Sequence, residues 1–252
     1  MKQGYGQYCP LALAAELLGQ RWTVLVISRL IDGCTTFNDI HRGVPRISPS
    51  LLSRRLTELE DYGLLVREQQ PGKSTYRYIL TEAGWDLEDI IMQLAVWGQH
   101  WARDMVLDDL DPAFLAWSMH MRINTNAMPA GRTVLEFDFS GTPQETYRFW
   151  LVNNDGKVDM CLKHPGFDAD LVVSANLKLF VEVWRGFRSL QDEIAAKTIK
   201  LEGPRKYREA LPEWLLLSAL APFPRKRDGR ELEVARQHAC VPQASDASRD
   251  SR

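Results

Sequence analysis

The chain has 252 residues, of which 45% are hydrophobic and 25% are charged, with 16 Gly and 13 Pro. These proportions exclude a collagen-like or wholly disordered chain. The length exceeds the usual domain of about 100 to 150 residues, so two domains are expected. The four cysteines, at positions 9, 34, 161 and 240, form no C-x-x-C pair, which favours free thiols in a reducing cytosol.

No stretch of the sequence approaches the ~18 consecutive apolar residues of a membrane span, and the first ten residues lack the apolar run of a secretion signal. A cytoplasmic protein without a membrane partner is therefore expected. The His, Asp and Glu residues show no spacing typical of a metal or nucleophile site. We expect neither an enzyme nor a bound metal or cofactor.

Helical spacing of apolar residues begins early in the chain. It fills 11–31, where Gly19 divides the pattern into two helices. Thr36, followed three residues later by Asp39, is a capping-box-like start for a short helix that ends near Gly43.

A further helix is predicted at 50–61, where Ser48 supplies the N-cap and a proline follows at the first helical position. Its apolar stripe is Leu52, Leu56 and Leu59, at the spacing i, i+4, i+7. A second face is polar and basic, and it consists of Ser50, Ser53, Arg54 and Thr57.

Two alternating runs, 64–69 and 74–80, predict a β-hairpin with a basic tip at 70–73. Thr81 then caps one long helix through about Met105. Helices followed by a hairpin, with an exposed polar helix face, are typical of a winged helix-turn-helix that reads DNA.

Residues 9 to about 102 resemble the HxlR family of bacterial winged-helix regulators. The residues that carry this resemblance are Cys9-Pro10, Gly19-x-x-Trp22 with Leu25, Phe37-x-x-Ile40, Ile47-Ser48-Pro49-x-x-Leu52-x-x-Arg55-Leu56-x-x-Leu59, Tyr62-Gly63-Leu64-Leu65 and Tyr78-x-Leu80-Thr81-x-x-Gly84. The resemblance implies a homodimer whose outer helices pair across a two-fold axis, with each recognition helix in the major groove of one operator half-site.

Arg54 is the predicted base contact, because a guanidinium fork suits the two acceptors of guanine. Ser48 and the amides of the first turn would meet a phosphate. Arg55 lies off the polar face, so it would either pair with Glu58 or reach the DNA backbone. The full set of predicted DNA contacts is Ser48, Ser50, Ser53, Arg54, Arg55, Thr57, Arg42, Arg46, Lys73, Ser74 and Arg77.

An acidic segment at 102–111 marks the expected boundary, near Asp111. Beyond it the pattern predicts an α+β domain with an antiparallel sheet covered by helices. The predicted strands are 134–139, 147–151, 158–162, 171–175 and 198–202, and the predicted helices are 113–123, 177–194 and 204–217.

Residues 112 to 220 resemble the sterol carrier protein type two domain. This resemblance is carried by Asp170-Leu-Val-Val-Ser, Trp184-x-Gly186 and Ile194-x-x-x-x-Ile199-Lys200-Leu201-Glu202-Gly203-Pro204. It implies an apolar cavity for a small hydrophobic ligand, lined by Phe149, Met160, Phe180, Trp184 and Phe187. A plain packed core would use the same residues at the same spacing.

The chain is thus expected to comprise a winged-helix domain with a dimerisation helix at 1–105, a sterol-carrier-protein-like domain at 112–220 and a disordered tail at 224–252. Residues 1–80 have a net charge of +3, from ten Lys and Arg against seven Asp and Glu, whereas residues 81–111 have −7, from one against eight. The basic module would approach DNA, and the acidic segment would be repelled by it.

The main hypothesis is a homodimeric transcriptional regulator that a hydrophobic ligand modulates. In the alternative, Cys9 acts as a thiol or redox sensor, as a Cys-Pro cysteine does in some HxlR members, and the second domain serves dimerisation or partner binding. A structural role for Cys9 beneath the dimer helices is the simpler interpretation. A third hypothesis is a lipid-handling protein whose winged helix binds another protein, but the polar helix face and the basic hairpin tip argue against it.

Overall fold

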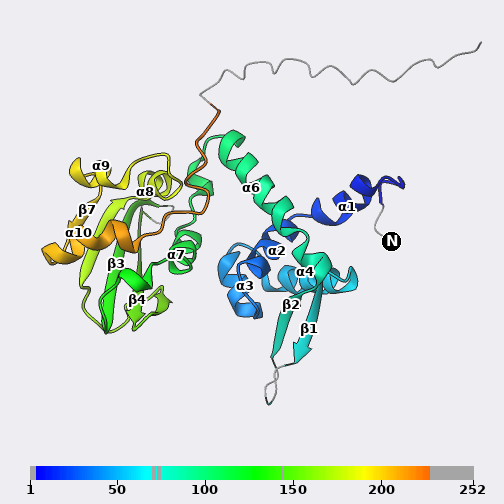
Figure 1. The fold of residues 1–252 in the computed structure, drawn as a ribbon, viewed down its shortest axis with the longest axis horizontal. Helices are drawn as coiled ribbons and strands as arrows, with labels where there is room; N and C mark the ends of the chain where they lie inside the picture. The colour runs from blue at the N-terminus through cyan, green and yellow to red at the C-terminus, as the bar shows by residue number, and fades with distance from the viewer. Residues whose placement is uncertain (1–3, 70–71, 73–74, 143–144, 228–252) are drawn as a thin grey trace, which may run out of the picture.

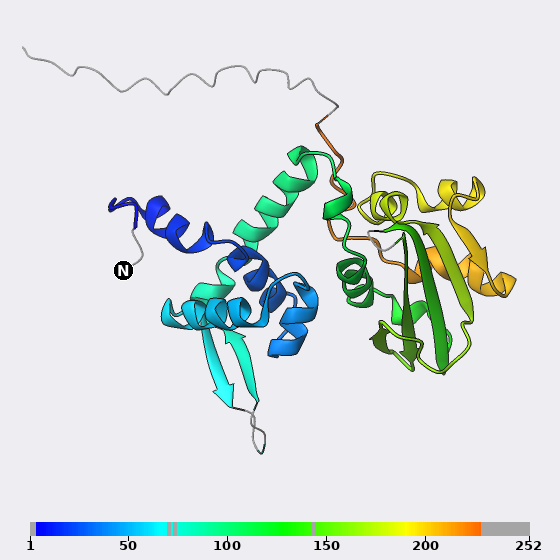
Figure 2. The same cartoon turned by 180° about the vertical axis from the view of Figure 1, so that it is seen from behind.

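The computed structural model describes residues 4–69, 72, 75–142 and 145–227. The chain forms two lobes, and a segment that leaves the end of α6 connects them (Figure 1). The first lobe ends in a hairpin that projects from it, and the view from behind shows the second lobe beside the first-lobe helices and away from that hairpin (Figure 2). Within the described residues, no single helix has the length and apolar composition of a membrane span, and α1 with α2 passes that test only as a pair bent by 85°.

Four helices open the chain, as the apolar spacing predicts: α1 (Pro10–Leu18), α2 (Thr23–Ile31), α3 (Phe37–Gly43) and α4 (Pro49–Asp61). Thr36 and Ser48 cap α3 and α4, because their hydroxyls accept hydrogen bonds from the amides of Asp39 and Leu51. The apolar sides of α2, α3 and α4 form the core of this lobe, in which Val26, Ile27, Ile40 and Leu52 are fully buried.

The predicted hairpin consists of β1 (Leu65–Gln69) and β2 (Tyr76–Leu80), paired antiparallel with Leu65 opposite Leu80. A third segment joins it, because the Tyr78 amide donates to the Thr35 carbonyl at 2.8 Å and Arg77 forms a bridge with Thr36. The start of α3 therefore holds the base of the hairpin.

The single long helix predicted for 81–105 is wrong at two points. Its first part is α5 (Glu82–Trp85), and α6 (Glu88–Trp101) follows after a break. Gly84 lies against the Leu64 carbonyl so closely that a Cβ atom would be 2.2 Å from its oxygen. This contact ties α5 to the hairpin base, while α6 leaves in its own direction.

The chain stops being helical after Trp101, four residues before the predicted end. Segment 224–227 returns from far along the sequence and bonds to this helix end. The amides of Lys226 and Arg227 donate to the His100 carbonyl at 3.0 Å, and Arg225 Nη2 donates to the Ala102 carbonyl at 3.0 Å. These carbonyls are thus satisfied without a further helical turn.

The second lobe is built on a five-stranded sheet in the order β5-β4-β3-β6-β7. Its strands are β3 (Arg132–Thr142), β4 (Glu145–Asn154), β5 (Lys157–Cys161), β6 (Leu171–Asn176) and β7 (Lys200–Glu202). The expectation of an antiparallel sheet is wrong for one pair, because β3 and β6 run parallel. The reason is the connection 162–170, which carries the chain from β5, at one edge, across to the far side of β3.

Helices cover one face of the sheet. They are α7 (Pro112–His120), α8 (Leu177–Trp184), α9 (Leu190–Ala195) and α10 (Arg205–Trp214), with short 3₁₀ turns η1 (Leu107–Asp109) and η2 (Thr125–Ala127). Leu135, Phe137 and Phe139 of β3 point into the core beneath them and are fully buried. On the opposite face, Arg148 pairs with Asp138 at 2.8 Å. The second lobe is therefore α+β with one apolar face and one mainly polar face.

Helix α7 contributes to the cores of both lobes. Leu115, Ala116 and Met119 are buried in the core of the second lobe, whereas Trp117 is buried in the first. The guanidinium of Arg29, on α2, lies 4.4 Å from the Trp117 ring centroid. Gly43 at the end of α3 leaves room for this indole, since a Cβ atom there would be 3.0 Å from it. The two lobes are thus joined by α7, a helix of the second lobe with one side chain buried in the core of the first.

The predicted tail, 224–252, begins with four described residues that are bonded to the end of α6. The sheet and its helices span the residues for which the sterol carrier resemblance was noted, and that resemblance stays a prediction. Residues 228–252 lie outside the described part of the chain.

Replacing Trp117 by alanine is expected to lower the free energy of unfolding by about 3–5 kcal/mol, because it leaves a cavity between the lobes. Denaturant unfolding followed by circular dichroism should also separate into two transitions as the lobes lose their coupling. Phe114→Ala is the matched control, since Phe114 is 42% exposed, and its cost should be about 1 kcal/mol or less. A single transition with the parent midpoint in Trp117→Ala would contradict the shared role of this residue.

Candidate nucleic-acid interface

Helix α4 presents one buried and one exposed face. Leu52, Leu56 and Leu59 are at most 1% exposed, which fixes the rotation of the helix on the core. The opposite face is exposed as the spacing predicts, and it comprises Ser50, Ser53, Arg54 and Thr57. These four side chains form a continuous polar surface with one positive charge.

The N-terminus of α4 lies next to this surface. Pro49 occupies the first helical position, and the Ser48 hydroxyl accepts from the Leu51 amide at 3.3 Å. Ser48 and Ser50 lie hydroxyl to hydroxyl at 3.3 Å, and both are exposed. Helix N-termini attract anions through their unpaired amides and the helix dipole, so this end suits a phosphate group.

Arg55 lies on the other side of α4, where it is held by neighbouring groups, and its contact with DNA stays a prediction. It is 8% exposed, and its Nε donates to the Arg21 carbonyl at 3.0 Å. Its Nη1 donates to Gln20 at 2.6 Å and pairs with Glu58, the alternative partner named above. The helical spacing indicates this burial, because Arg55 is three residues after Leu52 and four before Leu59, and both leucines are on the buried side.

The two arginines that flank the turn before α4 differ in their surroundings. Arg42 is 64% exposed and lies 3.5 Å from Asp39. Arg46 is held by the linker, because its Nε pairs with Asp111 at 3.2 Å and its Nη1 donates to the Asp108 carbonyl at 2.6 Å. A phosphate at Arg46 would have to compete with these two acceptors.

The hairpin carries two exposed arginines. Arg77 is exposed on β2, as the sequence predicts, whereas Arg67 on β1 was not among the predicted contacts. The Arg67 guanidinium lies 4.8 Å from the Tyr76 ring centroid and 3.7 Å from Glu60. The predicted tip contacts Lys73 and Ser74 lie outside the described residues. Arg67 lies opposite Tyr78 and Arg77 lies opposite Glu68, so the two arginines are on different faces of the hairpin.

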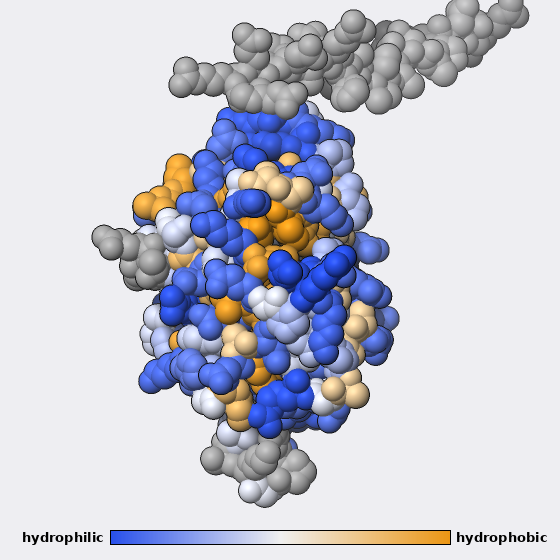
Figure 3. Space-filling view, turned by 90° about the vertical axis from the view of Figure 1, so that its left-hand side faces the viewer, coloured by the Kyte–Doolittle hydropathy of each residue, from blue (hydrophilic) through white to orange (hydrophobic). Residues whose placement is uncertain are grey.

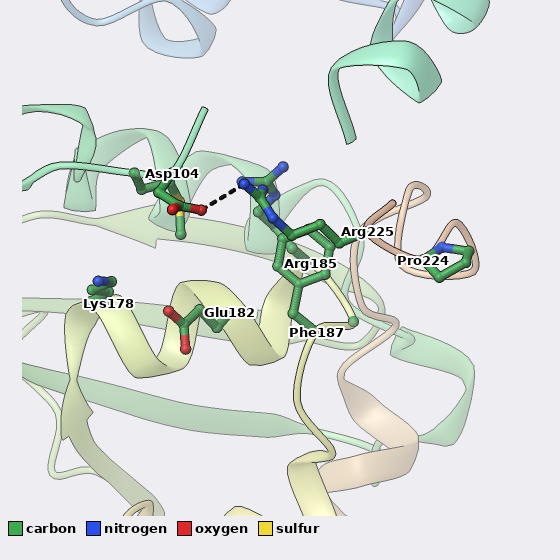
Figure 4. A pocket seen from close by; sticks show the side chains of 9 residues that line it. Asp104, Lys178, Glu182, Arg185, Phe187, Pro224 and Arg225 are labelled. Carbon is green, nitrogen blue, oxygen red and sulfur yellow. Dashed lines mark hydrogen bonds and ion pairs between the residues drawn. The ribbon is translucent and has the colours of Figure 1, made fainter. Parts of the chain in front are cut away.

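The predicted ligand-lining residues are mostly packed against one another and their neighbours. Phe149 lies 4.9 Å from Phe137 between ring centroids, Phe180 lies 4.9 Å from Phe139, and Phe149 and Phe180 are at most 1% exposed. Trp184 is 6% exposed, and Met160 packs against both cores. Among the five, Phe187 lines a described cavity, one of about 410 Å³ at the end of α8 (Figure 4).

A second cavity, of about 700 Å³, lies between α9, β7 and α10. This end of the second lobe is mainly hydrophilic, with apolar residues gathered near its centre (Figure 3). The cavity combines apolar and charged side chains, which are Ile194, Ile199, Leu201, Lys197, Lys200, Arg205, Arg208 and Glu209. None of the predicted lining residues is among them.

The three described cysteines differ in access to solvent. Cys9 is exposed at the N-cap of α1. Cys34 is buried, and burial raises the pKa of its thiol to about 11. Burial also raises the pKa of Cys161. Cys240 lies outside the described residues, and in the part of the chain that the structure describes no three His, Cys, Asp or Glu side chains are grouped as a metal site.

Comparison with known proteins gives the first lobe a family. The HxlR-like helix-turn-helix family matches residues 17–105. The HTH-type transcriptional regulator YybR of Bacillus subtilis is 36% identical over 94 residues, which are 36% of this chain and 74% of YybR. YvaP of the same organism is 32% identical over 111 residues, covering 43% of this chain and 95% of YvaP.

Another relative, YodB of B. subtilis, is an HTH-type transcriptional regulator that is 36% identical over 91 residues, covering 35% of this chain and 81% of YodB. The solved structure of reduced YodB is 33% identical to this protein. The match covers 38% of this chain and 97% of the YodB chain, with a TM-score of 0.34. The solved structure of the redox regulator HypR in its reduced form is also 33% identical. That match covers 36% of this chain and 91% of the HypR chain, with a TM-score of 0.34. Through its first lobe, the chain belongs to the HxlR-like helix-turn-helix family.

Proposed function

We propose that the protein is a sequence-specific DNA-binding transcriptional regulator that acts as a homodimer and responds to a small ligand. The observation that carries the proposal is the exposed polar face of α4, opposite three leucines that are at most 1% exposed. A helix held in this way can enter a major groove without disturbing its own core. Family membership supports the same function.

In the proposed complex, Arg54 reads a base edge and the N-terminus of α4 holds a phosphate. Arg54 is exposed at the centre of the polar face, and its guanidinium can donate two hydrogen bonds to guanine O6 and N7. Arg42, with a side chain that is 64% exposed, and Arg77 on the hairpin flank this face and contact the DNA backbone. Backbone contacts supply affinity and orientation, whereas Arg54 supplies sequence preference.

The homodimer is proposed from an apolar stripe that the single chain leaves uncovered. On α6, Ile90, Leu94, Trp97 and Trp101 follow one another at i, i+4, i+7 and i+11 and are between 39% and 60% exposed. Leu11 and Leu13 of α1 are also exposed. Water contact of this much aromatic and aliphatic surface is unfavourable, and pairing of the helices with a second copy would remove it. Such pairing would place two α4 helices for two half-sites.

Ligand response is proposed from the way the second lobe is attached to α6. Gln99 is 1% exposed, and its Nε2 donates to the carbonyls of Arg185 and Leu220 at 2.8 and 3.2 Å. Its Oε1 accepts from Arg185 Nε at 3.0 Å. A ligand that binds near this junction would act on the same helix that carries the dimer stripe. Its effect requires different affinities for the DNA-competent and DNA-incompetent arrangements.

A second candidate function is thiol sensing through Cys9. Its thiol is exposed, whereas Cys34 is buried with a pKa of about 11 and stays protonated near neutral pH. Two relatives add support: YodB has been solved in reduced, diamide-treated and quinone-bound forms, and HypR is described as a redox regulator. In this case the second lobe would serve dimerisation or partner binding.

Arg54→Ala is expected to weaken operator binding about 10- to 100-fold, since one bidentate base contact is lost. The operator is selected from random duplexes by the purified protein, and titrations are run at one fixed salt concentration. Arg208→Ala, which removes a cation on α10 in the second lobe, is the control and should bind as the parent does. An Arg54→Ala complex as tight as that of the parent would remove α4 as the reading helix.

Leu94→Glu is expected to convert the dimer to a monomer, because it places a charge within the apolar stripe of α6. Light scattering after size exclusion gives the mass, and the operator titration should show weaker binding by the monomer. Gln93→Glu introduces the same residue at the adjacent exposed position and should leave the dimer intact. If the parent itself is a monomer at micromolar concentration, the proposed dimer is wrong.

If Cys9 senses oxidants, diamide should release the operator from the parent protein and leave the Cys9→Ser complex bound. Cys161→Ser is the matched control and should respond as the parent does, since burial raises the pKa of Cys161. The readout is operator affinity before and after treatment, with restoration by a thiol reductant. Release of the operator from Cys9→Ser to the same extent as from the parent would exclude this cysteine as the sensor.

A further inference from the structure

The cavity of about 410 Å³ lies where three separate segments of the chain meet. The linker after α6 forms one wall, α8 and the turn after it form the second, and segment 224–225 forms the third (Figure 4). Its volume is within the range of sites for small ligands. The lining residues are Asp104, Met105, Lys178, Glu182, Arg185, Gly186, Phe187, Pro224 and Arg225.

Two of the three cations that line this cavity, Arg185 and Lys178, have hydrogen-bond donors that no described residue uses. Arg225 pairs with Asp104 at 2.6 Å, and Glu182 is held by Arg188 at 2.5 Å. Arg185 uses its Nε for Gln99, and among the described residues its two terminal nitrogens have no hydrogen-bond partner. The Lys178 ammonium likewise has no partner within the part of the chain that the structure describes.

Electrostatics favour the entry of an anion. Burial and the neighbouring Arg225 both lower the pKa of Arg185, so the positive charge of Arg185 is poorly compensated. Three cations and two carboxylates line the cavity, which gives their side chains a net charge of +1. A ligand with one negative charge would neutralise these side chains, whereas a phosphate dianion would leave the site with a net charge of −1.

An apolar surface lies beside these cations. The Phe187 ring centroid is 4.6 Å from the Arg185 guanidinium and 5.9 Å from that of Arg225. Met105 and Pro224 complete the apolar part of the lining. A ligand that carries its charge on a flat apolar body would use both parts of the cavity.

We propose that this cavity binds a small organic monocarboxylate with an aromatic body. The carboxylate lies between Arg185 and Arg225, because a guanidinium fork matches a carboxylate in geometry and charge. Lys178 adds a third cation from α8. The proposal rests on the proposed ligand-responsive function for its role in regulation, whereas its binding chemistry can be measured without DNA.

Binding would change the attachment of the linker. The ligand carboxylate competes with Asp104 for Arg225, whose Nη2 also donates to the Ala102 carbonyl at the end of α6. Arg225 is thus the group through which an occupied cavity would act on the helix that carries the dimer stripe. The ligand is able to shift the protein between two arrangements only if they differ in this contact.

Benzoate is the probe, and its binding to the full chain is measured by ligand-observed NMR and calorimetry. Benzamide, its neutral analogue of similar shape, and inorganic phosphate are measured in parallel. We expect benzoate to bind and benzamide to bind at least about tenfold more weakly, since the charge-assisted hydrogen bonds are lost. Inorganic phosphate should not compete with benzoate, because it lacks the apolar body.

Arg225→Gln and Lys178→Gln are both expected to weaken benzoate binding, the first by about tenfold or more and the second by a few fold. Lys178 is exposed, so its variant tests the cavity without risk to folding. Lys200→Gln, an exposed change in the other cavity, is the matched control and should bind as the parent does. Circular dichroism of each variant establishes that the fold is retained.

The proposal is overturned if benzoate fails to bind at about 10 mM, if benzamide binds equally well, or if neither cavity variant differs from Lys200→Gln. Displacement of benzoate by phosphate would indicate a simple anion site and would also overturn it. Benzoate binding without any selected operator would leave the cavity assignment standing and remove the proposed regulatory function. Operator binding without benzoate binding would do the reverse.

Discussion

The burial of Trp117 in the core of the first lobe is the constraint on which the arrangement of the two lobes depends. Its indole lies under Arg29 and beside Gly43, while its neighbours Leu115, Ala116 and Met119 belong to the second core. A helix buried on two sides cannot rotate without exposing one of them. The second lobe is therefore held beside α2 and α3, which leaves the polar face of α4 and the hairpin uncovered (Figures 1 and 2).

Local signals were sufficient to predict α1 to α4 and the hairpin, but not the break between α5 and α6. Thr36 and Ser48 act as caps where the sequence places them, because capping depends on residues at most three positions away. The helix predicted through Met105 ends at Trp101 because its last carbonyls accept bonds from Arg225 and the residues after it. These bonds join positions more than 120 residues apart in the sequence, so a local sequence pattern cannot predict where this helix ends.

The sequence likewise predicted some features of the candidate sites and not others. Helical periodicity places Ser50, Ser53, Arg54 and Thr57 together on the exposed face, and it places Arg55 on the side of the buried leucines. Phe149 and Phe180 illustrate the opposite limit, since alternation predicts that they point inward without distinguishing a packed ring cluster from a cavity wall. The parallel pairing of β3 with β6 depends on where a nine-residue connection crosses the sheet, which strand patterns do not encode.

The acidic linker connects the cavity of about 410 Å³, where a ligand would bind, with the turn before α4, the helix proposed to read DNA. Arg103 lowers the pKa of Asp109 to about 2 through a side-chain hydrogen bond, and the Asp109 carboxylate also accepts from the Val106 amide at 2.9 Å. Near the start of the linker, Asp104 holds Arg225 at the cavity; near its end, Asp108 and Asp111 hold Arg46 in the turn before α4. A carboxylate that displaces Asp104 would therefore act on a segment whose far end bonds to Arg46, in the turn before α4. The segment 81–111, whose net charge is −7, thus supplies carboxylates that pair with arginines of both lobes.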